Sequence, residues 1–393
     1  MTHTEYEFAA LLGNVVFGKP LPQDFAVEDL RKLALLALRH DMGHIIYKGL
    51  DIHGLIADKN DTGIQKLYNH YMMAIYRVTV LENEFRRVKE VLKKHNIDFL
   101  PLKGSVLRGS YREPWMRVSA DIDILVKSSE IADSVCKLLV KELEYELLHG
   151  EADYDCAVLA PSGFHVEVHF ALGSRGSKPM GILSTVWEKH VVRVGDDGCE
   201  FKADADFFYF YHVYHASRHF LNGGCGVKAL LDEAVLAMPF EVSPGLRGML
   251  DEAGLSTFRD TLSEITSRWF GASDSPLAFD RPDDLAEKTG LYILEGGMFG
   301  GGHYIKAQVA RKSNRFTYFV RRLFPPATSM VPNYPSLKKT KLTLPFCWIH
   351  RIAVKGIGKG KIKESLDDDI VKRVNDGETV NEIRELFKEL EMV

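Results

Sequence analysis

The stretch from Leu100 to Val126, LPLKGSVLRGSYREPWMRVSADIDILV, decides the fold of this chain. It ends in an apolar run that carries two acids, Asp121-Ile122-Asp123-Ile124-Leu125-Val126. Because side chains alternate along a strand, Asp121 and Asp123 are predicted to project from one face, with their Cα atoms roughly 7 Å apart. Two close carboxylates repel each other, and burying them without compensation is costly. The expected compensation is a divalent cation, Mg²⁺ or Mn²⁺, which takes carboxylate oxygens and keeps positions open for phosphate oxygens.

Two features on either side of this strand also fit phosphate chemistry. Upstream, Gly104-Ser105 predicts a turn that opens a helix, whose free N–H groups and dipole favour a phosphate. Downstream, the segment FHVEVHF (residues 164–170) predicts another strand, with Glu167 between apolar neighbours. A Gly-Ser turn, an Asp-x-Asp strand and a later acid on a strand together indicate phosphoryl or nucleotidyl transfer.

This pattern resembles the signature of the nucleotidyltransferases of the DNA polymerase β superfamily. The chain is more similar still to a poorly characterised bacterial branch, NTP_transf_5. The residues that carry this closer resemblance are Leu102-Lys103-Gly104, Leu107, Tyr111, Arg117, residues 121–126 and residues 165–169. The likeness extends over about residues 81–238 and again around residues 323–351. It implies a metal-dependent nucleotidyltransferase that moves a nucleoside monophosphate from an NTP, expected to be ATP, to an acceptor hydroxyl with release of pyrophosphate.

The resemblance also implies roles for individual residues. Asp121, Asp123 and Glu167 are expected to be the catalytic carboxylates and the metal ligands. The groups expected to bind the nucleotide phosphates are Lys103, Gly104, Ser105, Arg117 and Lys228. The interval from Ser105 to Asp121 is longer than the superfamily usually has, which predicts an additional turn or helix between them.

The predicted fold is α+β, with a polymerase β-like core of mixed sheet and flanking helices embedded in helical regions. Its expected parts are a helical region 1–95, the core 96–202, a helical segment 203–245 that closes the nucleotide cleft, and a mostly helical region 246–393. Strands are predicted at 98–102, 121–126, 145–148, 154–160 and 164–170, and helices at 27–49, 62–94, 128–143 and 206–220. The nucleotide is expected between the core and residues 206–240, with Tyr209 and Tyr214 available to stack on the base.

Composition narrows the class of protein. The 393 residues are 46% apolar and 26% charged, as in ordinary globular proteins. A net charge of −4 disfavours a non-specific nucleic-acid binder, although a local basic groove stays possible. The five scattered cysteines predict reduced, buried thiols in a cytoplasmic protein, and no apolar run reaches membrane-spanning length.

Several alternatives stay open at this level. The Asp pair and Glu167 could instead be solvated acids on the surface of a sheet. His169 fits either a partner of a metal ligand or a structural histidine. A zinc site formed by His165 and His169 is a further alternative, but no cysteine supports it. The basic stretches at residues 311–322 and 351–363 fit solvated faces or a polyanionic acceptor such as RNA. The rival functions are a catalytically inactive nucleotide-binding or protein-interaction module on the same fold, and an RNA end-modifying nucleotidyltransferase. The acceptor is left open among a small molecule, a glycan precursor and a protein.

Overall fold

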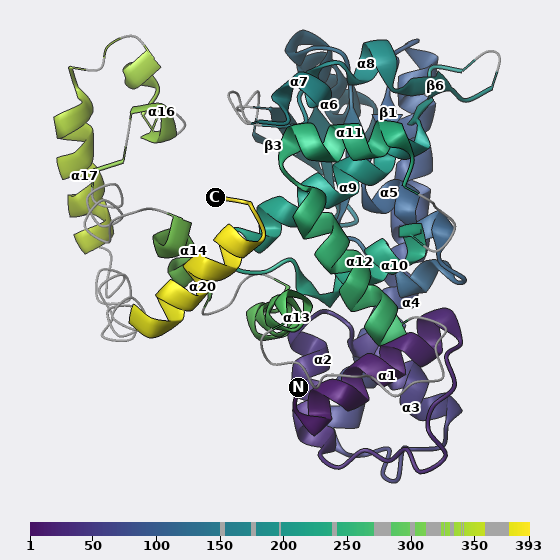
Figure 1. Cartoon of the computed structure of the whole chain (residues 1–393). Helices are drawn as coiled ribbons and strands as arrows, with labels where there is room; N and C mark the ends of the chain where they lie inside the picture. The colour runs from purple at the N-terminus through teal and green to yellow at the C-terminus, as the bar shows by residue number, and fades with distance from the viewer. Residues whose placement is uncertain are drawn as a thin grey trace.

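The computed structural model describes residues 1–149, 154–173, 178–195, 198–237, 242–270, 284–298 and 303–311, short stretches between 324 and 357, and residues 377–393. Within these residues the chain is mixed α+β, with a five-stranded sheet and a two-stranded hairpin among numerous helices (Figure 1). The α+β class is confirmed, and the architecture is consistent with a nucleotidyltransferase-like fold.

The five-stranded sheet has the strand order β1-β2-β5-β4-β3. Its strands are β1 (Leu100–Pro101), β2 (Asp121–Leu125), β3 (Glu146–His149), β4 (Asp155–Leu159) and β5 (His165–His169). β2 and β5 run parallel and the other pairs antiparallel, so the sheet is mixed as predicted. β1 is shorter than the predicted strand 98–102, because the Phe99 N–H donates to Cys199 O outside this sheet and Lys103 turns the chain at φ 47°.

Helices cover one face of the sheet. α6 (Ser129–Leu143) begins where the Ser128 hydroxyl accepts from the Ile131 N–H, and it packs on this face beside the C-terminal half of α4 (Thr62–Lys94). The apolar residues of β2 and β5, such as Ile122 and Val166, point into this layer and are fully buried. By the alternation of a strand, the acids of β2 and β5 must then lie on the opposite face.

The N-terminal region is helical, as predicted. It contains α1 (His3–Phe17), α2 (Leu30–Arg39) and α3 (Gly43–Ile52) before α4. The predicted helix 27–49 is wrong as a single element, because α2 ends at His40 and Asp41 takes a left-handed conformation with φ 58°. His40 ends the helix in a buried position, where its Nε2 lies 3.0 Å from Leu294 O. The break places Asp41 at a corner between helices.

Short elements connect the phosphate turn to the Asp strand. They are α5 (Gly104–Leu107), η1 (Arg108–Ser110) and η2 (Pro114–Met116). They confirm the additional helix or turn predicted between Ser105 and Asp121.

In the described residues after the sheet, helices continue apart from one hairpin. In chain order the elements are α7 (Met180–Ser184), α8 (Val186–Lys189), β6 (Val191–Arg193), β7 (Phe201–Ala203), α9 (Ala205–Phe220), α10 (Gly226–Ala237), α11 (Pro244–Ala253), α12 (Ser256–Phe270), α13 (Leu285–Gly296), α14 (His303–Arg311), α16 (Ala327–Met330), η3 (Pro335–Lys338), α17 (Leu344–Ile357) and α20 (Gly377–Glu389). The predicted helix 206–220 is confirmed as α9.

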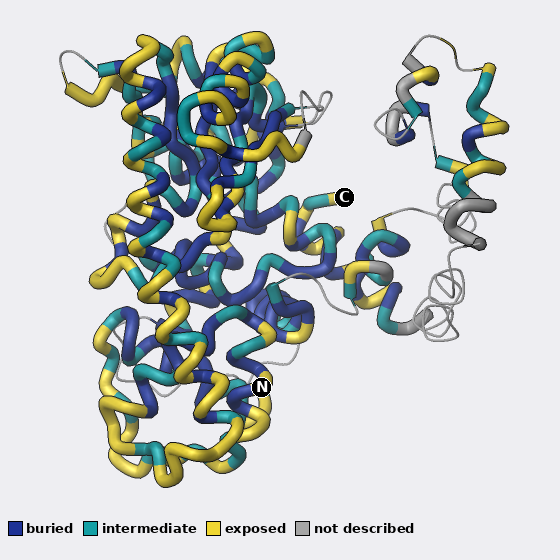
Figure 2. Tube along the Cα trace, turned by 180° about the vertical axis from the view of Figure 1, so that it is seen from behind, coloured by how far each residue is buried: buried dark blue, intermediate teal, exposed yellow. Residues whose placement is uncertain are grey.

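Two large hydrophobic clusters hold the main body together. One lies between the sheet, α6 and the second half of α4. The larger one joins α1–α3 to α9–α14 and α20, so the first and last described segments share a core with the middle of the chain (Figure 2). α4 contributes Leu67 to the larger cluster and Val88 to the other, and it therefore links the two. The division of the chain into four parts, with boundaries at residues 95, 202 and 245, stays a prediction.

Two of the five cysteines differ from the prediction that all of them are reduced thiols. Cys136 of α6 and Cys156 of β4 form a disulfide, whereas Cys199, Cys225 and Cys347 are free. The sequence could not show this pair, because the two residues are 20 positions apart and meet only when α6 packs on β4.

Other expectations concern the surface and the C-terminal region. No helix in the described part of the chain has the length and apolar character that a membrane crossing requires.

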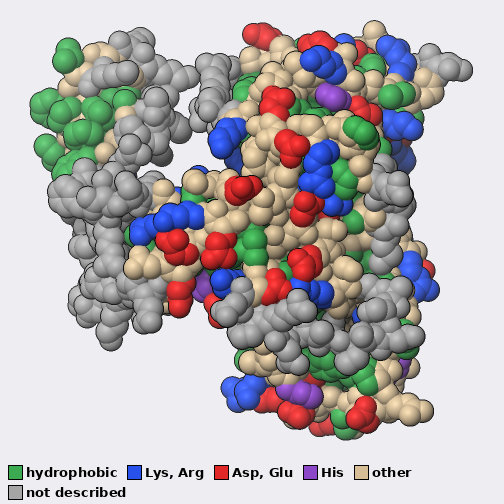
Figure 3. Space-filling model, viewed as in Figure 1, with side chains coloured by type: hydrophobic (Ala, Val, Ile, Leu, Met, Phe, Trp, Pro, Cys, Tyr) green, Lys and Arg blue, Asp and Glu red, His purple; other side chains and the backbone are tan. Residues whose placement is uncertain are grey.

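α17 exposes the large apolar side chains of Phe346 and Ile349, and hydrophobic side chains gather over α16 and α17 in Figure 3. Most of the two predicted basic stretches lies outside the described residues, namely residues 312–322 and 358–363.

Candidate active site

The carboxylates gather where β2 and β5 run side by side. In this parallel pair Asp123 is the register partner of Glu167, and Asp121 is the partner of His165. Asp123 is buried, Asp121 and Glu167 are half-buried, and His165 is exposed. The sheet thus brings two segments that are more than 40 residues apart in sequence to one face.

The tightest group at this place comprises Asp123, Glu167 and His169, whose potential ligand atoms all lie within 4.8 Å of one another. His169 Nε2 donates to Asp123 Oδ1 over 2.8 Å and lies 3.3 Å from Glu167 Oε2. Tyr154 stacks on the His169 ring, with the planes 6° apart and the centroids 6.3 Å apart. Asp121 lies outside this compact group, although its carboxyl group is close enough to feel the charges of Asp123 and Glu167.

Lys103 is the second cation at Asp123. Its Nζ donates to Asp123 Oδ1 over 2.7 Å. Burial opposes the charge of Asp123, but Lys103 and His169 outweigh it and hold the pKa of this carboxyl group well below its usual range. Burial likewise opposes the charge of Lys103, and Asp123 nevertheless raises its pKa. Against the effect of burial, hydrogen bonds to Asp123 and Glu167 raise the pKa of His169 to about 9, so the imidazole is cationic at neutral pH.

The negative charge of Asp121 is compensated less well than that of Asp123. Burial and the negative charge of Asp123 raise the pKa of Asp121 to about 6, and Lys103 offsets this only in part. The ligand groups at this site decide whether a hard divalent cation fits between β2 and β5. Three carboxyl groups supply oxygen ligands of the kind that Mg²⁺ prefers, and added positive charge would relieve the repulsion at Asp121. The residues therefore fit such an ion, held by Asp123 and Glu167 with Asp121 beside them.

The turn at Gly104-Ser105 lies directly beyond Lys103. Lys103 has φ 47° and ψ −125°, a combination that residues with a side chain rarely adopt, and such strain is concentrated at functional sites. Gly104 packs so closely that a Cβ there would lie 2.0 Å from Ser119 Oγ, and α5 begins at this glycine. Ser105 Oγ is buried without a hydrogen-bond partner in the described part of the protein. This hydroxyl is available to donate to a ligand.

Arg117 and Lys228 have protein partners in this structure. The Arg117 Nε donates to Asp232 Oδ1 over 2.6 Å, and the same oxygen accepts from the Tyr111 hydroxyl. Lys228 Nζ lies 3.4 Å from Asp41 Oδ2 and 3.2 Å from Val118 O. Their charges still reach the acids, because Arg117 and Lys228 both interact electrostatically with Asp121.

Helix α9 supplies side chains near the acids that the sequence reasoning did not select. Tyr211 and His215 are both close enough to interact electrostatically with Lys103 and Asp123, and His219 Nε2 lies 3.2 Å from His215 Nε2. These three residues are spaced i, i+4 and i+8, so they lie on one helical face, and that spacing was the available signal. Tyr209, which was expected to stack on the base, is instead fully buried and donates its hydroxyl to Glu233.

One comparison with known proteins gives a family for the chain. The sheet with its row of acids has the features of a nucleotidyltransferase-like protein. The chain belongs to a family described as uncharacterised nucleotidyltransferase, NTP_transf_5, whose model matches residues 27–264. No curated protein and no solved structure shows a significant match. The family match includes most of the N-terminal helices, which the resemblance at residues 81–238 left out, and it does not include residues 323–351.

Proposed function

We propose that this protein is a metal-dependent nucleotidyltransferase that moves a nucleoside monophosphate from an NTP, with ATP as the first candidate, to the hydroxyl of an acceptor. The observation that carries the proposal is the meeting of Asp121, Asp123 and Glu167 on one face of a parallel strand pair, beside the Lys103-Gly104-Ser105 turn. Membership of a nucleotidyltransferase family supports the same chemistry.

In this proposal each group of residues has a defined task. Asp121, Asp123 and Glu167 hold Mg²⁺ or Mn²⁺, which when bound neutralises charge on the α-phosphate and on the leaving pyrophosphate. The acceptor oxygen forms a bond to the α-phosphorus, the bond to the bridging oxygen of the β-phosphate breaks, and Glu167 takes the proton of the acceptor hydroxyl. Ser105 donates to the leaving phosphates. Lys103, Arg117 and Lys228 supply positive charge around them.

The Lys103–Asp123 ion pair bears directly on this proposal. A lysine that neutralises the central acid is also what a catalytically inactive nucleotide-binding module on the same fold would need. Lys103 and His169 both contact Asp123 Oδ1, so Asp123 Oδ2 and Glu167 would hold the metal, which would supply positive charge to the phosphates when bound. The two functions therefore differ in whether any NTP releases pyrophosphate. The cytoplasm, which supplies NTP and magnesium, is the compartment proposed for either.

The test combines turnover with metal binding. Pyrophosphate release is measured with each of the four NTPs and Mg²⁺, and Mn²⁺ binding is measured separately by electron paramagnetic resonance. Asp123→Asn should lower turnover at least 100-fold, because one removed stabilising group typically costs that much, and should weaken Mn²⁺ binding. Asp133→Asn, on the exposed face of α6, is the matched control and should change neither. Mn²⁺ binding without pyrophosphate release from any NTP would favour the inactive module.

A further inference from the structure

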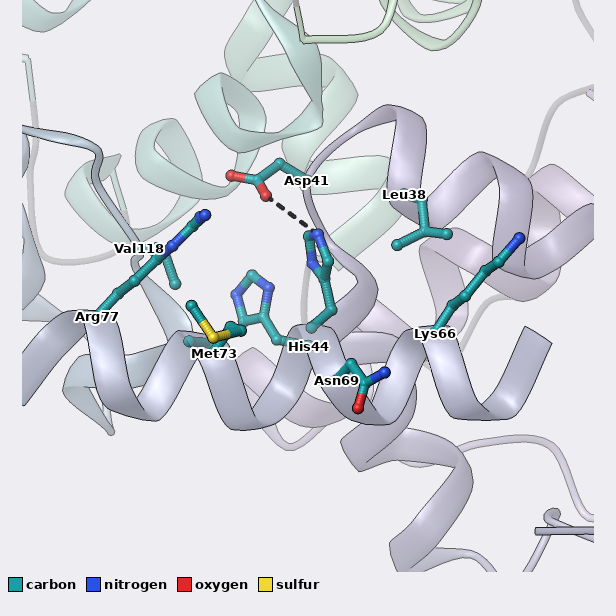
Figure 4. A pocket seen from close by; sticks show the side chains of 10 residues that line it. Leu38, Asp41, His44, Lys66, Asn69, Met73, Arg77 and Val118 are labelled. Atoms are coloured by element: carbon teal, nitrogen blue, oxygen red, sulfur yellow. Dashed lines mark ion pairs between the residues drawn. The ribbon is translucent and has the colours of Figure 1, made fainter. Parts of the chain in front are cut away.

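A cavity of about 270 Å³ lies beside the candidate active site, and none of the three acids lines it (Figure 4). Its floor is a single stripe of α4, formed by residues 66, 69, 70, 73, 74 and 77, which follow the i, i+3, i+4 spacing of one helical face. Its walls come from the corner between α2 and α3, with Asp41 and His44, and from Val118.

The lining contains two cations and one acid. Lys66 and Arg77 line it, and neither forms an ion pair with any residue that the structure describes. Asp41, the acid of the lining, already has two partners: Lys228 Nζ at 3.4 Å and His70 Nε2 at 3.8 Å. Figure 4 shows Arg77 reaching past Val118 toward the side on which Asp41 lies. Two cations are thus left without a counter-charge around a concave site.

The rest of the lining is apolar. Leu38, Met73, Ala74 and Val118 contribute carbon surface to the same cavity. A small concave site with an apolar body and convergent polar groups is the usual form of a small-molecule site. Lys66 is exposed, as an ordinary solvated cation of a helix surface is, whereas Arg77 is half-buried beside Val118.

The cavity is connected to the acids through Lys228 and Val118. Lys228 contacts Asp41 and the Val118 carbonyl oxygen on the cavity side, and its charge acts on Asp121. Val118 also lies only three residues before Asp121, at the start of β2. A molecule in the cavity would therefore lie on the flank of the site, outside the phosphate turn at Gly104-Ser105.

We propose that this cavity binds the acceptor of the nucleotidyl transfer, and that the acceptor is a small organic anion with an apolar body and a carboxylate or phosphate group. Arg77 binds its anionic group, and Met73 and Val118 contact its apolar part. The acceptor role rests on the proposed function, whereas the binding of an anion in the cavity does not depend on it.

Methionine methyl groups give a local readout. Met73 lines the cavity, whereas its neighbour Met72 does not, and both are exposed on α4. The full-length protein is labelled with ¹³C at its methionine methyl groups, and the signals are assigned with Met72→Leu and Met73→Leu. Benzoate and phenyl phosphate are then titrated separately, without metal or NTP. The Met73 signal should shift with at least one probe, and the Met72 signal should stay in place.

Matched variants test the charges. Arg77→Met should weaken probe binding about tenfold, since it removes a charge-assisted hydrogen bond. Lys66→Met removes an exposed cation at the far end of the stripe and should change probe binding much less. Arg86→Met lies on the same helix outside the cavity and should leave binding unchanged. Circular dichroism checks that each variant is folded. A stronger response to benzoate assigns a carboxylate, and a stronger response to phenyl phosphate assigns a phosphate.

The outcomes separate the two proposals. Asp121→Asn should keep probe binding while it loses NTP turnover. If the wild-type protein releases pyrophosphate but Met73 does not respond to either probe, the acceptor cavity is wrong and the proposed function stands. If probes bind but no NTP is ever turned over, the proposed function fails and the cavity remains an anion site. If metal-free ATP shifts Met73 and competes with the probes, the cavity belongs to the nucleotide, which overturns the acceptor assignment.

Discussion

At the scale of single residues, the centre of the site is an acid held between two cations. Asp123 is 2% exposed, and both Lys103 and His169 contact its Oδ1. A buried carboxylate is tolerated only when it is paired, so Lys103 compensates a charge that would otherwise destabilise the fold. Lys103 also has the strained backbone that turns the chain into α5. One residue therefore serves both the stability and the shape of the site.

The first prediction follows from this pairing. Lys103→Met should lower the free energy of unfolding in metal-free buffer by about 3 kcal/mol, because it leaves a buried carboxylate with only His169 as partner. Added Mg²⁺ should restore part of the loss. Urea unfolding followed by circular dichroism measures both effects.

Two controls make this test specific. The double variant Lys103→Met with Asp123→Asn should recover most of the lost stability, because it removes the charge as well as its partner. Lys127→Met breaks only the exposed pair with Asp98 and should cost less than about 1 kcal/mol. An equal loss in the single and double variants would mean that Lys103 acts through packing alone.

At the scale of elements, α9, α10 and α12 are joined by a buried polar group. Glu233 of α10 is fully buried, accepts from the Tyr209 hydroxyl of α9 and lies 3.9 Å from Arg259 Nε of α12. Burial raises the pKa of Glu233 to about 7, and its hydrogen bond to Tyr209 and the charge of Arg259 offset this only in part. Burial therefore favours the protonated form of Glu233 in the folded protein.

The second prediction is a pH dependence of stability. Because the folded state binds this proton more tightly than the unfolded state, the contribution of Glu233 is fully present below about pH 4.5 and is lost as the pH rises toward 7. Glu233→Gln should remove that decline, which amounts to about 3 kcal/mol across the window. Urea unfolding at a series of pH values measures the slope. Glu252→Gln, on the exposed face of α11, should leave it unchanged, and a wild-type slope in Glu233→Gln would refute the assignment.

The disulfide between α6 and β4 leads to the third prediction. It closes a loop with a sequence separation of 20, for which loop closure predicts a stabilisation of about 3 kcal/mol. Cys136→Ala with Cys156→Ala should lower the free energy of unfolding by about that amount. The replacement of Cys199 by Ala is the control for the loss of a buried thiol alone. Alkylation followed by mass spectrometry should find three reactive thiols in the unfolded, unreduced protein, and five would show that the bond does not form.

At the scale of the whole molecule, the family region contains only part of the larger hydrophobic cluster. The match begins at residue 27, yet Phe8, Leu11 and Leu12 of α1 are fully buried in the larger hydrophobic cluster. Phe387 and Leu390 of α20 belong to the same cluster. Helices at both ends of the chain thus complete a surface that the family region would otherwise expose.

The fourth prediction concerns truncation. Residues 27–264 alone should not unfold cooperatively, because removing α1 exposes side chains that are each worth about 2–5 kcal/mol, against a total stability of about 5–15 kcal/mol. Differential scanning calorimetry of the fragment and of the full chain tests this. A fragment 1–264 separates the effect of α1 from that of the later helices. A single sharp transition of 27–264 at the temperature of the full chain would contradict the prediction.

The sequence by itself determined many of the local elements of this protein and the family to which it belongs. The alternation around Asp121 and Asp123 and around Glu167 predicted strands with acids on one face, because side-chain direction in a strand is a local property. The long helix 62–94 and the serine cap of α6 were local in the same sense. The resemblance carried by these motifs predicted the family that the comparison then confirmed.

Only the tertiary structure decided which distant residues come into contact. The pairing of Asp123 with Glu167, the contact of Lys103 and His169 with the same oxygen, and the Cys136–Cys156 bond all join residues at least 20 positions apart. Tyr209 is buried in the core, whereas Tyr211 lies near Lys103 and Asp123. Which face of α9 is buried depends on how α9 packs against α10 and α12. Such contacts depend on how whole elements pack, and local sequence patterns do not contain that information.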